Sequence, residues 1–128
     1  MVRKNSSAEK KGDSYLYPIN LKLYRMKELN QDDWKQGMQQ DEDAVILDVR
    51  TQEEVEEGYI PGAQNIDLYK GQGFVDEIEK LDKDKSYYVY CRSGKRSEQA
   101  CRLMDQLGFK KTYNLEGGFM EWEGETAE

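Results

Sequence analysis

The sequence predicts an α/β protein in which helices wrap a parallel β-sheet. Three observations support this fold. Strand-like and helix-like segments alternate along the chain from residue 15 onward. Residues 44–49, AVILDV, form a short apolar run bounded by charged residues, which is typical of a strand buried on both faces of a parallel sheet. The helix-like segments carry apolar side chains at helical spacing.

The chain of 128 residues is long enough for one domain with a single core, and no internal repeat or second linker divides it. Residues 1–14 are rich in Lys, Ser, Glu and Asp and contain almost nothing to bury. We therefore expect a flexible N-terminal tail over residues 1–14, followed by one domain over residues 15–128.

The first predicted elements are a strand over residues 19–26 and a helix that begins after Asn30. Pro18 directly precedes the strand, which favours a place at the edge of the sheet. Asn30 is a typical helix N-cap, and acidic residues follow it in the first turn. Trp34 and Met38 lie four residues apart and therefore share one helical face.

The strand over residues 44–49 is followed by a short predicted helix. Thr51 and Glu54 match the Thr-x-x-Glu pattern of a capping box, and Gly58 marks the end of this helix. A turn with the sequence IPGA then leads into AQNIDL, residues 63–68.

The remaining segments continue the alternation. Residues 73–81 predict a helix, residues 86–91 a strand, residues 97–108 a helix that ends at a glycine, residues 111–115 a last strand, and residues 117–125 a half-buried helical turn. The apolar side chains that define the two helices are Phe74, Ile78 and Leu81, and Ala100, Leu103, Met104 and Leu107.

The charge and the polar start of the chain argue against some partners and locations. The sequence has 19 basic and 26 acidic residues and a net charge of -7, which disfavours nucleic acid and anionic membranes as partners. No run of about eighteen apolar residues is present, so we expect no transmembrane helix. The start lacks the apolar stretch of a signal peptide, which favours a cytoplasmic location, although a sequence that begins after a removed export signal would look the same.

The sequence has two cysteines, Cys91 and Cys101, and no histidine. A Cys-His dyad, a Ser-His-Asp triad and the usual zinc sites each need an imidazole or more thiols than are present, so we expect none of them and no metal or other cofactor. A reaction at Cys91 must therefore use a thiolate that is stabilised by local electrostatics alone.

Cys91 lies where open α/β sheets form their sites, beyond the carboxyl end of a strand that leads into a helix. Asp48 and Arg50 follow the earlier strand in the same way. The loop after Cys91 offers backbone amides, a glycine that can adopt positive φ, Ser97 as a cap for the next helix, and cations, which together favour a thiolate and attract an anion. The residues of this predicted anion cradle are Arg92, Ser93, Gly94, Lys95, Arg96 and Ser97.

A plainer interpretation of these residues is also open. A cysteine at the end of a strand is more often a small buried hydrophobe than a nucleophile, and basic loop residues are usually just solvated. Cys101 lies about one turn into the predicted helix, beside Ala100 and Met104, so we expect it to pack in the core. The alternative is a resolving cysteine, which needs its Cα within about 7 Å of that of Cys91.

Three separated motifs then favour the functional interpretation, because in order and spacing they resemble the single-domain rhodaneses, which are thiosulfate sulfurtransferases. The motifs lie within about residues 20–124 and read ILDVRTQEEVEEGYIPGAQNIDL, YYVYCRSGKRSEQACRLMDQLGF and YNLEGGFMEW. The resemblance implies a rhodanese-like three-layer fold with a central, mostly parallel five-stranded sheet and helices on both faces. Tyr59 replaces the histidine of the family's usual Gly-His-Ile-Pro-Gly-Ala, a stretch that is structural in the family.

The resemblance also implies a mechanism. The thiolate of Cys91 would attack the outer sulfur of thiosulfate, sulfite would leave, and the persulfide would pass to cyanide or a thiol. The amides of residues 92–97 would hold the persulfide, while the three loop cations would draw in the dianion. Asp48 and Arg50 would support the site from beneath by an ion pair or hydrogen bonds, with direct substrate contact by Arg50 as the alternative.

Other functions are weighed against this one. The resemblance extends to cell-cycle dual-specificity phosphatases and some arsenate reductases, whose loops read Cys-x5-Arg, but Arg96 makes the present loop Cys-x4-Arg, a smaller cradle that suits sulfur better than phosphate. A sulfur carrier that exchanges persulfide with a protein donor or acceptor needs the same thiolate and cradle. A non-catalytic binding module on this fold commonly lacks the loop cysteine, which is present here.

Overall fold

The structure is a computed structural model that describes residues 26–128. The predicted tail over residues 1–14 and the predicted start of the domain at residue 15 lie outside the described residues. The predicted strand over residues 19–26 also lies outside them, except for Met26, which is not part of a strand.

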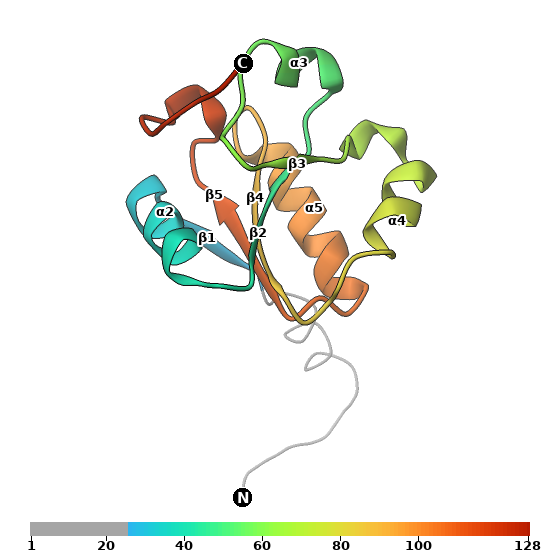
Figure 1. Ribbon diagram of the computed structural model, residues 1–128. Helices are drawn as coiled ribbons and strands as arrows, with labels where there is room; N and C mark the ends of the chain where they lie inside the picture. The colour runs from blue at the N-terminus through green and yellow to red at the C-terminus, as the bar shows by residue number, and fades with distance from the viewer. Residues whose placement is uncertain (1–25) are drawn as a thin grey trace, which may run out of the picture.

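Parallel strands form the centre of the fold (Figure 1). They are β1 (Lys27–Leu29), β2 (Ala44–Asp48), β3 (Gln64–Asn65), β4 (Ser86–Tyr90) and β5 (Lys111–Leu115). The strand order is β1-β5-β4-β2-β3, and each neighbouring pair is parallel. The predicted α/β fold with a five-stranded sheet is therefore confirmed.

Helices cover both faces of the sheet, as expected for a three-layer fold. The helices are α2 (Gln31–Gln40), α3 (Gln52–Glu56), α4 (Gln72–Ile78) and α5 (Lys95–Gln106), with short 3-10 helices η1 (Leu68–Lys70) and η2 (Phe119–Glu121). Helix α2 lies on one face, while α4 and α5 lie on the other (Figure 1). Helix α3 lies beyond the carboxyl ends of the strands (Figure 1). No helix within residues 26–128 is long and apolar enough to cross a membrane.

The N-caps predicted for α2 and α3 are present. The side chain of Asn30 accepts a hydrogen bond from the backbone amide of Asp33 at 2.8 Å. Thr51 and Glu54 form the complete capping box, in which each side chain accepts from the other residue's backbone amide. These local interactions satisfy amides that the helix itself leaves unpaired, which explains why α2 and α3 begin where the sequence predicts.

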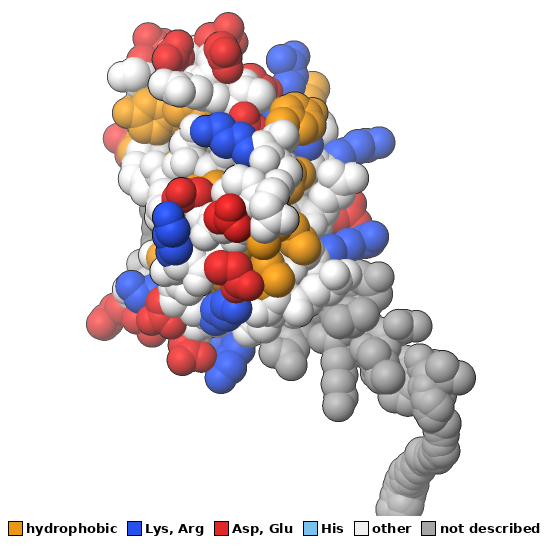
Figure 2. Space-filling view, turned by 90° about the vertical axis from the view of Figure 1, so that its right-hand side faces the viewer, with side chains coloured by type: hydrophobic (Ala, Val, Ile, Leu, Met, Phe, Trp, Pro, Cys, Tyr) orange, Lys and Arg blue, Asp and Glu red, His pale blue; other side chains and the backbone are white. Residues whose placement is uncertain are grey.

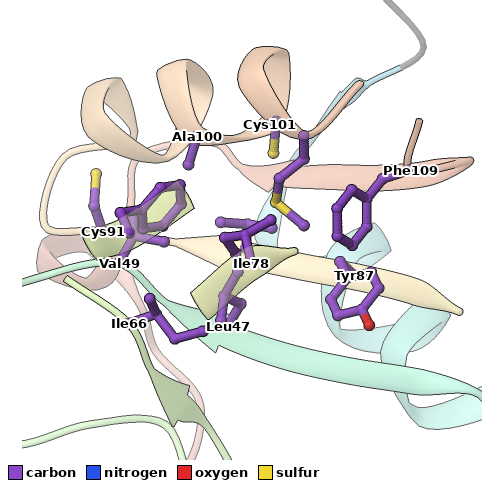
Figure 3. Packing of buried hydrophobic residues seen from close by; sticks show 12 residues of the cluster. Leu47, Val49, Ile66, Ile78, Tyr87, Cys91, Ala100, Cys101 and Phe109 are labelled. Carbon is purple, nitrogen blue, oxygen red and sulfur yellow. The ribbon is translucent and has the colours of Figure 1, made fainter. Parts of the chain in front are cut away.

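Strand β4 is buried along its whole length and supplies side chains to the core on both faces of the sheet. Tyr87, Val89 and Cys91 belong to the larger hydrophobic cluster, which also contains buried side chains of α4 and α5. Figure 3 shows Tyr87 and Cys91 within this cluster. Tyr88 and Tyr90 point the other way, toward α2. Cys91 is therefore attached to the most buried strand of the sheet.

The connections of β2 and β4 create a crevice at the carboxyl edge of the sheet. These strands are neighbours, but β2 leads to β3 on one side and β4 leads to β5 on the other. Ligand sites in open α/β sheets form at such a switch point, because the two connecting loops separate there. The segments after Asp48 and Tyr90 meet at this edge, where the backbone amide of Val49 donates to Tyr90 at 3.1 Å.

Replacement of Trp34 by alanine is expected to destabilise the protein by about 3–5 kcal/mol, because it leaves a large cavity in the core. The Trp34 side chain is fully buried and meets the rings of Tyr88 and Tyr90 edge to face. Urea unfolding measures the effect. Gln36→Ala, at an exposed position of the same helix, is the control and should change stability by less than about 0.5 kcal/mol. Equal effects of the two substitutions would contradict this account of the core.

Candidate active site

Cys91 follows β4 directly, and its sulfur is surrounded by hydrogen-bond donors from the next loop and helix. The Sγ atom accepts from the amide of Gly94 at 3.1 Å and from the amide and the hydroxyl of Ser97, both at 3.4 Å. The residue is fully buried. Three donors from the loop and the first turn of the next helix therefore converge on this sulfur.

Helix α5 begins at Lys95, two residues earlier than the sequence predicts, and its N-cap is Gly94. The prediction that Ser97 caps this helix is therefore wrong. The reason is that Gly94 adopts the left-handed conformation, with φ +102°, which turns the chain into the helix sooner. Ser97 lies instead in the first turn, where its hydroxyl points at the cysteine sulfur.

The carbonyl groups of Cys91 and Arg92 accept hydrogen bonds from a second loop, residues 116–120, which follows β5. The backbone amides of the loop after Cys91 are thereby left for a ligand. The amide of Phe119 donates to the carbonyl of Cys91 at 2.8 Å, and that of Met120 donates to the carbonyl of Arg92 at 3.0 Å. Among residues 26–128, no hydrogen-bond partner is present for the backbone amides of Arg92, Ser93, Lys95 and Arg96. The predicted cradle of amides is therefore available at Cys91.

The second loop approaches this closely because it contains two consecutive glycines. Gly117 and Gly118 both have positive φ, at +81° and +63°. A Cβ atom on Gly118 would overlap the carbonyl group of Arg92. The sequence pattern predicted only a terminal helical turn at these glycines. Two consecutive glycines one residue after a strand were the signal that the backbone turns sharply there.

The loop cations differ in their surroundings. Arg92 and Lys95 are exposed and form no ion pair with any residue in 26–128. The guanidinium of Arg96 binds both carboxylate oxygens of Glu54, at 2.7 and 2.9 Å. This hydrogen-bonded pairing lowers the pKa of Glu54 to about 2 and raises that of Arg96. Sequence analysis found Glu54 only as a helix cap and missed its second role.

Acidic and basic side chains meet near this end of the molecule. Figure 2 shows acidic side chains gathered at the top, where α3 lies, with basic and hydrophobic side chains next to one another just below. A cleft of about 230 Å³ opens beside the loop. Its lining residues are Arg50, Glu54, Glu57, Arg92, Phe119 and Met120.

Asp48 and Arg50 form the ion pair that sequence analysis expects, and both are almost fully buried. Their closest side-chain atoms are 2.7 Å apart. Arg50 also donates to the carbonyl of Gly58 at 2.8 Å, and its guanidinium carbon lies 4.4 Å from the centre of the Phe119 ring. This network joins the segment after β2 to the second loop, which in turn holds the carbonyl of Cys91.

Asn114 in β5 ties the cradle to the sheet from the other side. Its side-chain amide donates to the carbonyl of Gly94 at 3.0 Å and to the carboxylate of Glu28 in β1. Burial raises the pKa of Glu28. Sequence analysis placed Asn114 in a strand and gave it no part in the site, although a polar residue in a buried strand was a usable signal.

Cys101 packs in the core, as predicted. In Figure 3 the side chain of Cys91 points toward the first turn of α5, whereas Cys101 projects from α5 into the core beyond Ala100. Both cysteines are free thiols, and burial raises the pKa of Cys101, which keeps it protonated.

Comparison with known proteins identifies the family. The family model described as "Rhodanese-like domain" matches residues 31–125. The chain belongs to the rhodanese-like domain family. A solved structure of a rhodanese-like domain protein from Staphylococcus aureus shares 32% sequence identity and a TM-score of 0.67, and the match covers 78% of this chain and 94% of that one. These findings confirm the resemblance and the predicted rhodanese-like fold.

Sequence relatives carry names from sulfur transfer. The protein named "Putative sulfurtransferase YtwF" of Bacillus subtilis is 46% identical over 79% of this chain and 94% of its own length. The protein named "Putative sulfur carrier protein YrkF" of the same organism is 39% identical, but the match covers 77% of this chain and about half of YrkF, 52%. GlpE of Coxiella burnetii, named as a thiosulfate sulfurtransferase, is 40% identical over 63% of this chain and 73% of its own length.

The ion pair between Glu54 and Arg96 predicts a pH-dependent part of the stability. The folded-state pKa of about 2 lies below the ordinary 4.5, so the ionised carboxylate stabilises the fold above about pH 4.5, and this contribution is lost as the pH falls through 2. Glu54→Gln should therefore be less stable than wild type by about 1–2 kcal/mol at neutral pH, since both groups are partly solvated.

Urea unfolding at several pH values measures this difference, which should shrink as the pH falls from about 5 to about 2. Glu53→Gln, which removes an exposed charge from the same helix turn, is the control and should show little of this dependence. A difference between wild type and Glu54→Gln that stays constant with pH would show that the carboxylate charge is not the stabilising feature.

Proposed function

We propose that this protein is a sulfurtransferase that moves a sulfane sulfur from thiosulfate, or from another persulfide donor, to a thiophilic acceptor such as cyanide or a thiol. The observation that carries the proposal is the buried sulfur of Cys91, which accepts three hydrogen bonds at the base of a loop with unpaired amides. Membership of the rhodanese-like family and the sulfurtransferase names of the relatives support it.

The first half-reaction loads the protein. The thiolate of Cys91 attacks the outer sulfur of thiosulfate, a new S–S bond forms, and the old S–S bond breaks with its electron pair leaving on sulfite. The protein then holds an anionic persulfide. No proton moves in this step, which is consistent with a site that lacks histidine. The unpaired amides of the loop can donate hydrogen bonds to the added sulfur.

The second half-reaction returns the protein to its starting state. An acceptor such as cyanide attacks the outer persulfide sulfur, and the S–S bond breaks with its electron pair returning to Sγ of Cys91. Donor and acceptor use the same cysteine in turn, so ping-pong kinetics are expected. The donors around Sγ stabilise the leaving thiolate in this step.

The other predicted site residues act in three ways. Arg92 and Lys95 are free to attract the anionic donor, because they are exposed and unpaired within residues 26–128. Asp48 and Arg50 support the site through the second loop. The backbone of Ser93, Gly94 and Ser97 shapes the cradle.

A sulfur carrier is the second candidate, in which a partner protein supplies the persulfide and another receives it. The similarity to YrkF, whose name is "Putative sulfur carrier protein YrkF", favours this candidate. The same thiolate and cradle serve both functions. We also propose a cytoplasmic location, where a free thiol at Cys91 would persist.

Replacement of Cys91 by alanine should abolish sulfur loading, because no other thiol lies in the cradle. Intact-protein mass spectrometry after incubation with thiosulfate should show a gain of about 32 Da in wild type that disappears when cyanide is added. Cys101→Ala is the matched control and should load as wild type does. Loading that survives Cys91→Ala would refute the assignment. If thiosulfate fails but a small persulfide loads the protein, the carrier function is favoured.

Neutralisation of Arg92 and Lys95 should weaken thiosulfate binding without altering the chemical step. The double variant Arg92→Gln/Lys95→Gln is expected to raise KM for thiosulfate about tenfold at low salt, with kcat changed much less. The difference should diminish as salt screens the charges. Lys110→Gln, beyond the opposite end of α5, is the control. An unchanged KM in the double variant would contradict the steering role.

A further inference from the structure

The ion pair with Glu54 neutralises Arg96. Of the three cations in the loop after Cys91, only Arg92 and Lys95 therefore remain to attract an anionic substrate. Both guanidinium Nη atoms are engaged, at 2.7 and 2.9 Å from the two carboxylate oxygens. The side chains are only 16% and 25% exposed, so solvent screens this pair less than a surface pair. The arginine of the Cys-x4-Arg loop is thus neutralised within the protein.

Both partners are fixed by further contacts, so the pairing is a built feature rather than a chance surface contact. Glu54 Oε1 also accepts from the amide of Thr51 at 3.0 Å and from its hydroxyl at 3.1 Å. The guanidinium carbon of Arg96 lies 5.1 Å from the centre of the Tyr69 ring. The carboxylate is therefore positioned by the cap of α3, and the arginine lies between it and an aromatic ring.

The position of the pair allows it to influence the reacting centre. Arg96 lies in the first turn of α5, one residue before Ser97, whose amide and hydroxyl contact the sulfur of Cys91. Glu54 lines the cleft beside the loop together with Arg92. A net charge change at this pair would therefore act on an anion in the cradle over a short distance through partly screened surroundings.

We propose that Glu54 is a positioning residue that sets the donor specificity of the site: by holding and neutralising Arg96, it limits the affinity for dianionic oxyanions. This inference rests on the proposed sulfurtransferase function. Thiosulfate enters and sulfite leaves as a dianion, so a site with a third free cation would hold both more tightly. The neutralised pair allows sulfite to leave and keeps the site open to donors of lower charge.

Two donors of different charge test this inference directly. Thiosulfate is a dianion, whereas an alkanethiosulfonate such as methanethiosulfonate is a monoanion that offers the same outer sulfur and loses a sulfinate when its S–S bond breaks. In Glu54→Gln the freed Arg96 should lower KM for thiosulfate about three- to tenfold and lower KM for methanethiosulfonate less. Sulfite should inhibit this variant more strongly by a similar factor.

Glutamine is the appropriate replacement, because it can still serve in the capping box of α3 while losing the charge. Glu53→Gln removes an equal charge from the same turn without touching Arg96, and it should leave the ratio of the two KM values as in wild type. In Glu54→Gln/Arg96→Gln the pair is again neutral overall, so the ratio should return close to that of wild type.

The inference is overturned if Glu54→Gln leaves the ratio of the two KM values unchanged, or if Glu53→Gln changes this ratio equally. It is also overturned if the lower KM for thiosulfate persists when Arg96 is replaced as well. If wild type accepts sulfur from neither donor, the proposed function fails, and calorimetric titration with sulfite then decides the present inference separately. Binding about three- to tenfold tighter in Glu54→Gln than in wild type would support the role of Glu54, and equal affinity would overturn it.

Discussion

The site depends on two hydrogen bonds between loops that are far apart in the sequence. The amides of Phe119 and Met120 donate to the carbonyls of Cys91 and Arg92. Because these carbonyls are held from the outer side, the peptide groups of the loop cannot rotate freely, and its amides remain available at the sulfur. The close approach requires Gly118, since any side chain there would overlap the loop. The cradle is thus built by two segments rather than by one motif.

Buried polar side chains from the neighbouring strands hold these two loops in position. Arg50 reaches from the end of β2 to contact the Phe119 ring and the carbonyl of Gly58 while it remains paired with Asp48. Asn114 anchors the carbonyl of Gly94 from β5. A buried charge is costly unless it is paired and hydrogen-bonded, and Arg50 meets both conditions. Its interactions connect the carboxyl ends of the central strands into one support beneath Cys91.

The charge of the loop after Cys91 is opposite in sign to the net charge of the whole chain. The chain has a net charge of -7, yet the loop after Cys91 carries Arg92 and Lys95 in exposed positions. Glu54 offsets Arg96 within the same region. An anion that approaches the loop therefore meets a limited positive charge and a set of fixed amide dipoles. Such dipoles stabilise negative charge at the sulfur. Several free cations would in addition bind the anion itself tightly.

Sequence patterns alone predict the α/β fold, the caps at Asn30 and Thr51, the central strand and the position of Cys91 after it. These features follow from periodicity and from interactions between residues close in the chain, which sequence patterns record directly. Two features depend on the three-dimensional arrangement of the chain: the N-cap of α5 at Gly94 and the pairing of Arg96 with a glutamate 42 positions away. Sequence spacing cannot predict these, because partners on separate elements meet only once the sheet order and the path of each loop are fixed.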